Sequence, residues 1–484
     1  MENKSDWRKV YMSETIRTKN PLGYQPIGRL LMRFAIPSVV SMLVNALYNI
    51  VDQIFIGQGV GYLGNAATTV VFPLMTIILA VGTMLGAGGS AYAAIKLGEK
   101  DEDEAENTLG NQFLMLVIIG IFITVVGYVF LTPILNLFGA TPQNMAYSKQ
   151  YASIILFGTT FNLLGIGLSN MARTDGSPNV AMYSMLVGAV LNTVLDPFYI
   201  FVLHWGVKGA AIATVTSQVI GAVILVYYFT RKGNLRLKKE HMKLKPKLCL
   251  TIFNLGISSC ITQTAATIMQ IVMNNSLVIY GNMTTTGGDV ALSAMGIVLK
   301  VSMIITSVCV GIGIGAQPIL GFNKGAKQPK RIKATYKRAA LIATLTSIGG
   351  WILCVSFPSV ILSLFGKENA VFTEFAIKCM RTYMFGIFCA GFQITATSYF
   401  QATGQPLKAS ILSMMRQLIL LIPLLIVLPM FMGLDGILYA GPIADITSGI
   451  VVFCFISHEM KKLDKQIAME TEEELGVFSD TMTA

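Results

Sequence analysis

Long apolar stretches separated by short polar segments dominate the chain. They lack the strict alternation of barrel strands, and each is long enough to cross a hydrocarbon layer of ~30 Å as a helix. Because lipid offers no water to backbone polar groups, we predict an all-α integral membrane protein with twelve transmembrane helices. The predicted spans are residues 34–57, 66–95, 112–137, 147–172, 180–203, 209–230, 249–280, 290–317, 338–362, 379–402, 410–432 and 436–457.

An internal repeat divides these spans into two halves. The segment RTDGSPN at 173–179 resembles ATGQPLK at 402–408, and WGVKG at 205–209 resembles MGLDG at 432–436. The paired glycines lie about 228 residues apart in both matches, which indicates a duplication. Six spans per half is an even number, so we expect two six-helix lobes of the same orientation. They form a parallel repeat with a pseudo-two-fold axis along the membrane normal.

The most basic stretch of the chain, RKGNLRLKKEHMKLKPK at 231–247, lies between the two halves and is predicted to link them. The glycine-rich stretches at 82–90 and 311–317 fit either close helix packing or points where helices slide during a conformational cycle. The predicted parts are an N-terminal tail at 1–33, a first lobe at 34–230, the linker at 231–248, a second lobe at 249–457 and a C-terminal tail at 458–484.

Composition and charge agree with a membrane protein. Hydrophobic residues make up 54% of the chain and charged residues only 13%. The net charge of +11 sits mostly in short loops on one side of the predicted spans, so it controls topology and does not indicate nucleic-acid binding. This bias predicts a multi-pass plasma-membrane protein with both termini in the cytoplasm. The Lys and Arg residues outside the cytoplasmic group are Lys149, Lys208, Lys367 and Lys378 on the other side, and Lys300, Arg381 and Arg416 within spans.

No signature of an enzyme or of an ATP-driven pump occurs in the sequence. GFNKGAK at 321–327 has the wrong spacing for a phosphate-binding loop. The three histidines are scattered, and neither a metalloprotease motif nor a nucleophile elbow is present. We therefore expect no enzymatic activity and no cofactor, which leaves secondary transport, lipid flipping or a channel.

Three aspartates lie within predicted spans: Asp52, Asp196 and Asp445. A carboxylate inside the membrane is costly, so it usually faces the bundle interior and serves function. The alternative for each is a structural acid held by hydrogen bonds. Asp52 and Asp196 fall at similar depth in their spans, and two nearby acids in a low dielectric resist double ionisation. We therefore expect that protonation of one of them removes a charge and allows the helices to repack.

Polar residues of the first half are expected to surround these two acids. Several stand three or four residues apart on one helix face, and Thr214 enters at the same depth from the next span. The residues expected to converge are Asn45, Asn49, Asp52, Asn192, Asp196 and Thr214.

Pro197 directly follows Asp196 and removes a backbone hydrogen bond one turn earlier. The freed carbonyl of Thr193 is then available to a cation or a water. The second half has no matching acid, since span seven carries Gln263 and Gln270 but neither Asp nor Glu. Gln270 is, with Asn45, Lys300 and Pro197, a candidate residue of the substrate cavity or its gate. Lys300 in span eight fits either a paired or snorkelling cation or a cavity-lining charge.

The sequence resembles the bacterial multidrug and toxin extrusion (MATE) transporters. The resemblance spans nearly the whole chain, with motifs in order: VDQIFIG at 51–57, RTDGSP at 173–178, LNTVLDPFYIF followed by WGVKGAAIATVTSQ, GAQPILGFNKGA at 315–326 and QATGQP at 401–406.

This resemblance implies a V-shaped pair of lobes that rock between outward-open and inward-open states. It implies export of small amphipathic drugs and toxins, often cationic, in exchange for H⁺ or Na⁺, by a chain expected to act as a monomer among membrane lipids. The family's first-lobe cation pocket corresponds to Asp52, Asp196, Asn192 and Thr214, where Na⁺ is one of the two candidate ions. Some members carry acids in spans seven and ten, and their absence here argues against a second-lobe sodium site. The main alternative is a lipid-linked oligosaccharide or polysaccharide flippase of the same superfamily.

Overall fold

Proline and glycine set many of the helix boundaries. The computed structural model describes residues 21–60, 62–284, 287–363 and 370–483. Pro178, Pro246, Pro329 and Pro406 each stand in the first turn of a helix, where the missing N–H removes no helical hydrogen bond.

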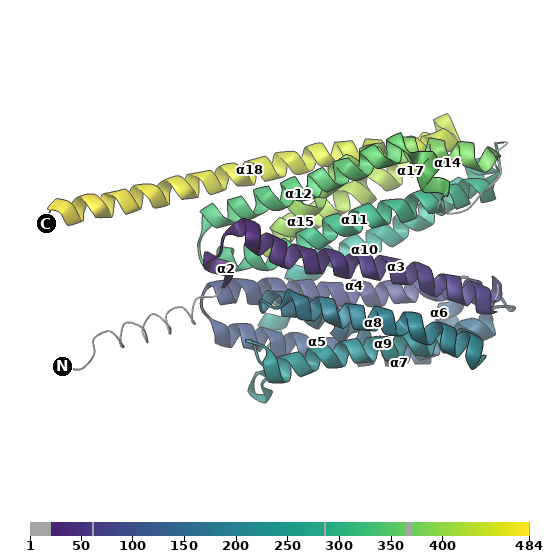
Figure 1. Cartoon of the computed structure of the whole chain (residues 1–484), viewed down its shortest axis with the longest axis horizontal. Coiled ribbons are helices and arrows are strands. Elements are labelled where there is room, and N and C mark those ends of the chain that lie inside the picture. The colour runs from purple at the N-terminus through teal and green to yellow at the C-terminus, as the bar shows by residue number, and fades with distance from the viewer. Residues whose placement is uncertain (1–20, 61, 285–286, 364–369, 484) are drawn as a thin grey trace.

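The first lobe contains the helices up to the linker, and its core is formed by apolar side chains from most of them. In Figure 1 these helices run roughly parallel along the long axis of the molecule. They are α2 (Pro21–Tyr24), α3 (Ile27–Val60), α4 (Tyr62–Gly98), α5 (Glu102–Val129), α6 (Leu131–Leu137), α7 (Met145–Thr174), α8 (Pro178–Pro197), η1 (Phe198–Val202), α9 (Gly206–Tyr227) and η2 (Tyr228–Lys232).

The second lobe follows the linker, which contains the short η3 (Lys239–His241), and packs around two further apolar clusters. Its helices are α10 (Pro246–Gly281), α11 (Gly288–Gly325), α12 (Pro329–Ser356), α13 (Pro358–Ser363), α14 (Ala370–Tyr383), η4 (Met384–Cys389), α15 (Ala390–Ala402), α16 (Pro406–Met414), η5 (Met415–Leu421), α17 (Ile422–Met432) and α18 (Leu434–Thr483).

The predicted spans overlap these helices, but several are not single α-helices: 112–137 breaks at Phe130, 338–362 breaks at Phe357, and 410–432 contains the π-helical turns of η5. In the described part of the chain, 11 helices are long and apolar enough to cross a membrane. The predicted span 379–402 is divided, because the 3₁₀ segment η4 separates α14 from α15. The first predicted span also starts too late, since α3 begins at Ile27. The twelve-helix, two-lobe architecture is thus confirmed.

Backbone geometry supports the internal repeat. Gly176 and Gly404, which the sequence comparison pairs, both have positive φ, at 86° and 76°. Lys100 and Lys327 also share a positive φ, at 64° and 52°, and lie at nearly the same separation. A non-glycine residue seldom adopts this conformation, so the second pair is independent support for the duplication.

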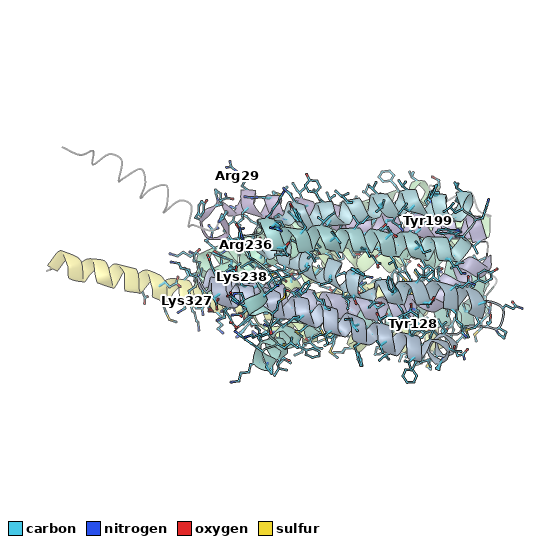
Figure 2. The ribbon with its side chains drawn as sticks, turned by 90° about the horizontal axis from the view of Figure 1, so that it is seen from below. Arg29, Tyr128, Tyr199, Arg236, Lys238 and Lys327 are labelled. Carbon is cyan, nitrogen blue, oxygen red and sulfur yellow. The ribbon has the colours of Figure 1, made fainter. Side chains whose placement is uncertain are left out.

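Basic side chains gather at one end of the molecule. Figure 2 shows Arg29, Arg236, Lys238 and Lys327 at this end, whereas Tyr128 and Tyr199 lie toward the other. We call these ends the linker face and the far face. In Figure 1, α2 and the C-terminal end of α18 are also at the linker face, and α18 continues past the bundle.

The two lobes touch closely in the half of the bundle nearer the linker face, where α4 meets α10. A Cβ atom on Gly88 would lie 1.9 Å from the carbonyl oxygen of Ile252. One on Gly256 would lie 1.8 Å from the carbonyl oxygen of Met84. The backbones of the two lobes are therefore in direct contact here, which only glycine permits.

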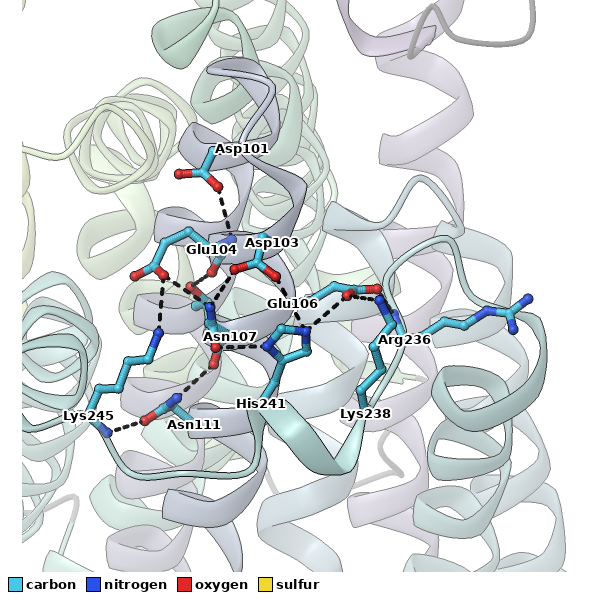
Figure 3. Close-up of polar contacts among 11 residues, drawn as sticks. Asp101, Asp103, Glu104, Glu106, Asn107, Asn111, Arg236, Lys238, His241 and Lys245 are labelled. Carbon is cyan, nitrogen blue, oxygen red and sulfur yellow. Dashed lines mark hydrogen bonds and ion pairs between the residues drawn. The ribbon is translucent and has the colours of Figure 1, made fainter.

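The linker is fastened to the acidic first turns of α5, as Figure 3 shows. The Glu106 carboxylate accepts hydrogen bonds from the backbone N–H of Arg236 at 3.1 Å and from Lys238 Nζ at 2.5 Å. The backbone N–H of Lys245 donates to Asn111 Oδ1 at 2.8 Å. The basic linker is thus anchored to the first lobe up to the start of α10.

The His241 ring lies within this anchor. Nδ1 is 2.9 Å from Asn107 Oδ1, and Nε2 is 3.3 Å from Glu106 Oε2 and 3.6 Å from Asp103 Oδ1. Asn107 Nδ2 donates to the carboxylates of Asp103 and Glu104, which fixes its oxygen toward the histidine. Both ring nitrogens therefore face side-chain oxygens of α5, which holds the ring in place.

Replacing His241 with Ala is expected to loosen the linker. The lost interactions involve partly exposed charges and amount to about 1 kcal/mol, so local opening should rise about fivefold. Limited trypsin digestion of the purified protein after the linker lysines, followed on gels, measures this opening. His458→Ala is the matched control, because His458 is exposed. Equal cleavage of both variants would contradict the anchoring role of His241.

Candidate functional site

A cavity of about 250 Å³ lies within the first lobe and at its border with the second. Its wall is mixed, with apolar side chains beside amide and hydroxyl groups, as is usual for small-molecule sites. The second lobe contributes Gln263 from α10. Among the described lining residues there is no lysine or arginine. The polar side chains of the lining include Asn45, Asn162, Asn192, Thr214, Gln218 and Gln263, and the apolar ones include Phe72, Met75, Phe161, Ile166 and Met185.

Asn192 connects this cavity to a buried acid. It lines the cavity, and its Nδ2 lies 3.3 Å from Asp196 Oδ1, one turn later on α8. The same Nδ2 lies 3.3 Å from Thr214 Oγ1 on α9. Asp196 itself is fully buried and is not part of the described cavity lining. A molecule in the cavity can therefore contact Asn192, which is itself within hydrogen-bonding distance of Asp196.

Asp52 of α3 and Asp196 of α8 form a carboxyl pair. The two groups lie within hydrogen-bonding reach of each other, and no lysine or arginine acts on either within the described residues. Each has one buried oxygen, Asp52 Oδ1 and Asp196 Oδ2, without a described hydrogen-bond donor. A single proton held between the two carboxyl groups would provide the missing donor and remove one of two like charges.

Two tyrosines lie next to the carboxyl pair. Tyr48 and Tyr151 both lie near enough to act electrostatically on Asp52 and Asp196. Tyr151 is 2% exposed, and Tyr48 also lines the cavity. Sequence reasoning missed both, although Tyr48 stands one turn before Asp52 on the same face of α3. No spacing in the sequence places Tyr151 near the carboxyl pair, because only tertiary packing brings its helix, α7, to this position.

Pro197 ends α8, and the chain continues as the π-helical turn η1. The N–H of Leu203 donates to the carbonyl of Phe198 at 3.1 Å, which is the wider π-type spacing. The backbone next to Asp196 is thus irregular, as the proline predicts, and such π turns occur frequently at functional sites.

Helix α3 joins this site to the other lobe. Leu30 and Phe34, near its start, are buried in a second-lobe core cluster with Ile312 and Ile319 of α11. Asp52, near its end, lies beside Asp196 in the first lobe. Pro37 interrupts the hydrogen bonding of α3 between these two parts. One helix therefore reaches from the carboxyl pair to the core of the second lobe.

Comparison with known proteins identifies the family. The MatE family model matches residues 37–198 and 260–427, which together exceed half of the chain. This chain belongs to the MatE family. The match covers parts of both lobes, in agreement with the repeat.

Bacterial relatives of this MATE chain are named as exporters. The chain is 26% identical over 455 residues to "Multidrug export protein MepA" of Staphylococcus haemolyticus (strain JCSC1435), covering 92% of this chain and 97% of the relative. It is also 26% identical over 430 residues to the protein of the same name from Staphylococcus aureus (strain NCTC 8325 / PS 47), covering 87% and 91%.

Solved structures show the same fold. "Crystal structure of MATE in complex with MaL6" aligns with a TM-score of 0.86 at 24% identity, covering 92% of this chain and 99% of that one. "Outward-facing conformation of a multidrug resistance MATE family transporter of the MOP superfamily" aligns with a TM-score of 0.84 at 24% identity, covering 90% and 96%.

In this MATE chain, the acid of the second lobe differs from the first-lobe pair. Asp445 of α18 forms a salt bridge with Arg416 of η5. Its backbone carbonyl accepts a hydrogen bond from Gln393 Nε2 at 2.7 Å. Because a guanidinium compensates its charge, the surroundings of Asp445 fit the alternative given for it above, a structural acid held by its partners.

The structure brings together most of the predicted site residues. Asp52, Asp196, Asn192 and Thr214 converge as expected, and Asn45 lines the adjoining cavity.

Three predicted residues remain outside this group. The side chain of Asn49 lies outside the described residues. Gln270 and Lys300 are exposed and do not belong to the described cavity lining. The cavity instead takes Gln263 from α10, two turns before Gln270.

Proposed function

We propose that this chain is a secondary active exporter of amphipathic, often cationic compounds that exchanges them for H⁺ or Na⁺. One observation carries the proposal: Asn192 lies between a drug-sized cavity and a buried carboxyl pair that lacks a compensating cation. The family membership and the names of the relatives support export as the direction and multiple drugs as the cargo. The mixed cavity wall without a lysine or arginine among its described residues suits cations better than anionic glycolipids.

The coupling follows from charge. When both carboxyl groups are ionised, they attract a cation and repel each other, which favours a larger separation of α3 and α8. A bound proton removes one charge and allows the two helices to approach. Asn192 then changes its partners, and the shape of the cavity wall changes with it. Cargo and coupling ion thereby favour different arrangements of the same helices, which is what exchange requires.

The geometry supports H⁺ more directly than Na⁺. A proton needs only the two oxygens that lack donors. A sodium ion needs several oxygen ligands, and the described residues hold no group of three His, Cys, Asp or Glu that could bind a metal ion. Sodium would thus also need Thr214, Asn192 or backbone carbonyls as ligands.

We propose further that the linker face is cytoplasmic, because it carries the basic loops of both lobes. The lobes touch in the half nearer that face, so the arrangement described here corresponds to an outward-facing state. Opening of the same contact would admit cargo from the cytoplasm.

Efflux from proteoliposomes tests this proposal. Vesicles loaded with a fluorescent lipophilic cation are given an imposed H⁺ gradient or an imposed Na⁺ gradient in separate experiments. We expect one gradient to accelerate efflux by at least about tenfold over empty liposomes. Efflux at the passive rate under both gradients would contradict exchange, and passive ion flux without cargo would indicate a channel.

A further inference from the structure

A buried arginine near the linker face has no acidic partner in the described structure. Arg173 stands in the last turn of α7 and is 2% exposed. Its Nη1 lies 3.1 Å from Asn170 Oδ1 and 3.4 Å from Ser169 Oγ, and its Nη2 lies 4.0 Å from Met185 Sδ. Its Nε has no hydrogen-bond acceptor among the described residues. The C-terminal end of α7 stabilises the guanidinium in part, but no carboxylate compensates its charge.

The acid next in sequence is occupied elsewhere. Asp175 accepts hydrogen bonds from Tyr228 Oη at 2.5 Å and from the backbone N–H groups of Asn234 and Leu235 at 3.0 Å and 2.8 Å. It therefore fixes the start of the linker to the first lobe and leaves Arg173 unpaired. The guanidinium of Arg173 therefore has no carboxylate partner among the described residues, although an acid lies two positions away in the sequence.

Arg173 lies between two spaces. On one side is a cavity of about 10 Å³ at the contact between the lobes, close to the size of one water. The second lobe covers it with Ile314, Gln317 and Pro318 of α11, and Gln317 is fixed by a hydrogen bond to Gln401 at 3.1 Å. On the other side, the Met185 side chain that Nη2 contacts lines the large cavity.

One face of α7 connects these two spaces. Asn162 and Ile166 line the large cavity, and Asn170 and Arg173 line the small one. Spacings of three and four residues place all of them on the same side of the helix. When the lobes separate at the linker face, α11 leaves this side, and Arg173 becomes a cation in the path from the linker face to the large cavity.

We propose that Arg173 binds an oxyanion of the cargo, in the first instance a carboxylate, as cargo enters from the linker face. This inference rests on the proposed export cycle and deepens it. A guanidinium pairs with a carboxylate through two parallel hydrogen bonds, and Nε and one Nη form the edge suited to it. The site selects amphiphiles that carry both a cation and a carboxylate over purely cationic ones. The cationic part is then attracted by Asp52 and Asp196, and the anionic part by Arg173.

A matched pair of dyes tests this selectivity in transport. Proteoliposomes of neutral phosphatidylcholine are given a zwitterionic rhodamine with a free carboxylate or its methyl ester, which is purely cationic. We expect Arg173→Gln to lower transport of the zwitterion roughly tenfold relative to the ester, and Arg173→Lys to restore part of it. Equal loss of both dyes, or no loss of either, would overturn the assignment. A second set of vesicles contains phosphatidylglycerol. If this lipid changes transport only when Arg173 is present, and changes it equally for both dyes, Arg173 binds lipid phosphate. That result would also overturn the assignment to a cargo carboxylate.

A binding measurement separates this inference from the export proposal. Gly256→Ala is expected to hold the lobes apart at the linker face, because the added Cβ meets the carbonyl of Met84. Fluorescence anisotropy on the purified protein should then show tighter binding of the zwitterion to Gly256→Ala than to the wild type. The double variant with Arg173→Gln should lose that gain while binding of the ester is unchanged. Binding of the zwitterion that is indifferent to Arg173 would contradict the site even if export is shown. Transport of neither dye by the wild type would contradict the export proposal alone.

Discussion

Asp196→Asn is expected to insert and fold normally and to abolish drug efflux. Asparagine has nearly the same shape and keeps a hydrogen-bonding side chain beside Asn192, so local packing is retained. It cannot change its charge, however, and therefore cannot exchange a cation for cargo. In cells without their own exporters, resistance to a lipophilic cation should fall to the level of cells without the protein, a change of at least about tenfold in efflux rate.

The matched control is Asp435→Asn. Asp435 is 44% exposed and pairs with Lys378 at 2.6 Å, so its replacement removes a surface salt bridge and no buried carboxyl group. It should leave efflux near the wild-type value. Quantitative immunoblots of membrane fractions verify that both variants are inserted equally. Normal resistance in cells that carry Asp196→Asn would contradict the coupling role of the carboxyl pair.

Gly256→Ala is expected to shift the protein toward the state that is open at the linker face. The added methyl group would lie 1.8 Å from the carbonyl oxygen of Met84, and backbone atoms cannot yield locally. Overpacking of this kind costs about 1–3 kcal/mol, which corresponds to a change of about fivefold to 150-fold in the ratio of the two states. Because the clash exists only where the lobes touch, the open state avoids it.

Cysteine accessibility measures this shift. A cysteine is placed at Ala91, which lines the small cavity at the lobe contact, in a background without native cysteines. A membrane-impermeant thiol reagent added at the linker face of vesicles should label it about tenfold faster when Gly256→Ala is present. Gly349→Ala is the control, because a Cβ there has no neighbour within 4 Å. Equal labelling in both variants would show that the α4–α10 contact does not control closure.

The sequence predicts much of this architecture because helical periodicity and hydrophobic length are local properties. The spacing of Asn192 and Asp196 places them on one face of α8, and the structure joins them by a hydrogen bond. Thr214 could be assigned to the site from its predicted depth in the membrane, because α9 is the next long helix after α8 and returns beside it. The break at η4 could not be predicted, because Met384–Cys389 is apolar and contains no proline.

The remaining parts of the site depend on how helices rotate and neighbour one another, which depth and periodicity do not determine. From the sequence we expect Gln270 at the cavity, yet Gln263 is the glutamine of α10 that belongs to the described lining. The salt bridge between Arg416 and Asp445 joins two helices whose contact is a result of tertiary packing. In the sequence, Arg173 looks like an ordinary basic residue at the end of a span, and only the structure shows that it is buried beside a small cavity that α11 covers.

Ion-coupled exchange at Asp196 is tested by comparing the wild type and Asp196→Asn side by side in proteoliposomes under the same imposed ion gradient. Cargo efflux and ion entry are recorded together, with H⁺ and Na⁺ tested separately. We predict that one ion gradient drives cargo efflux by the wild type and that this ion enters as cargo leaves. Asp196→Asn should show only the passive rate for both. Gradient-driven efflux by Asp196→Asn at the wild-type rate would contradict ion-coupled exchange at Asp196.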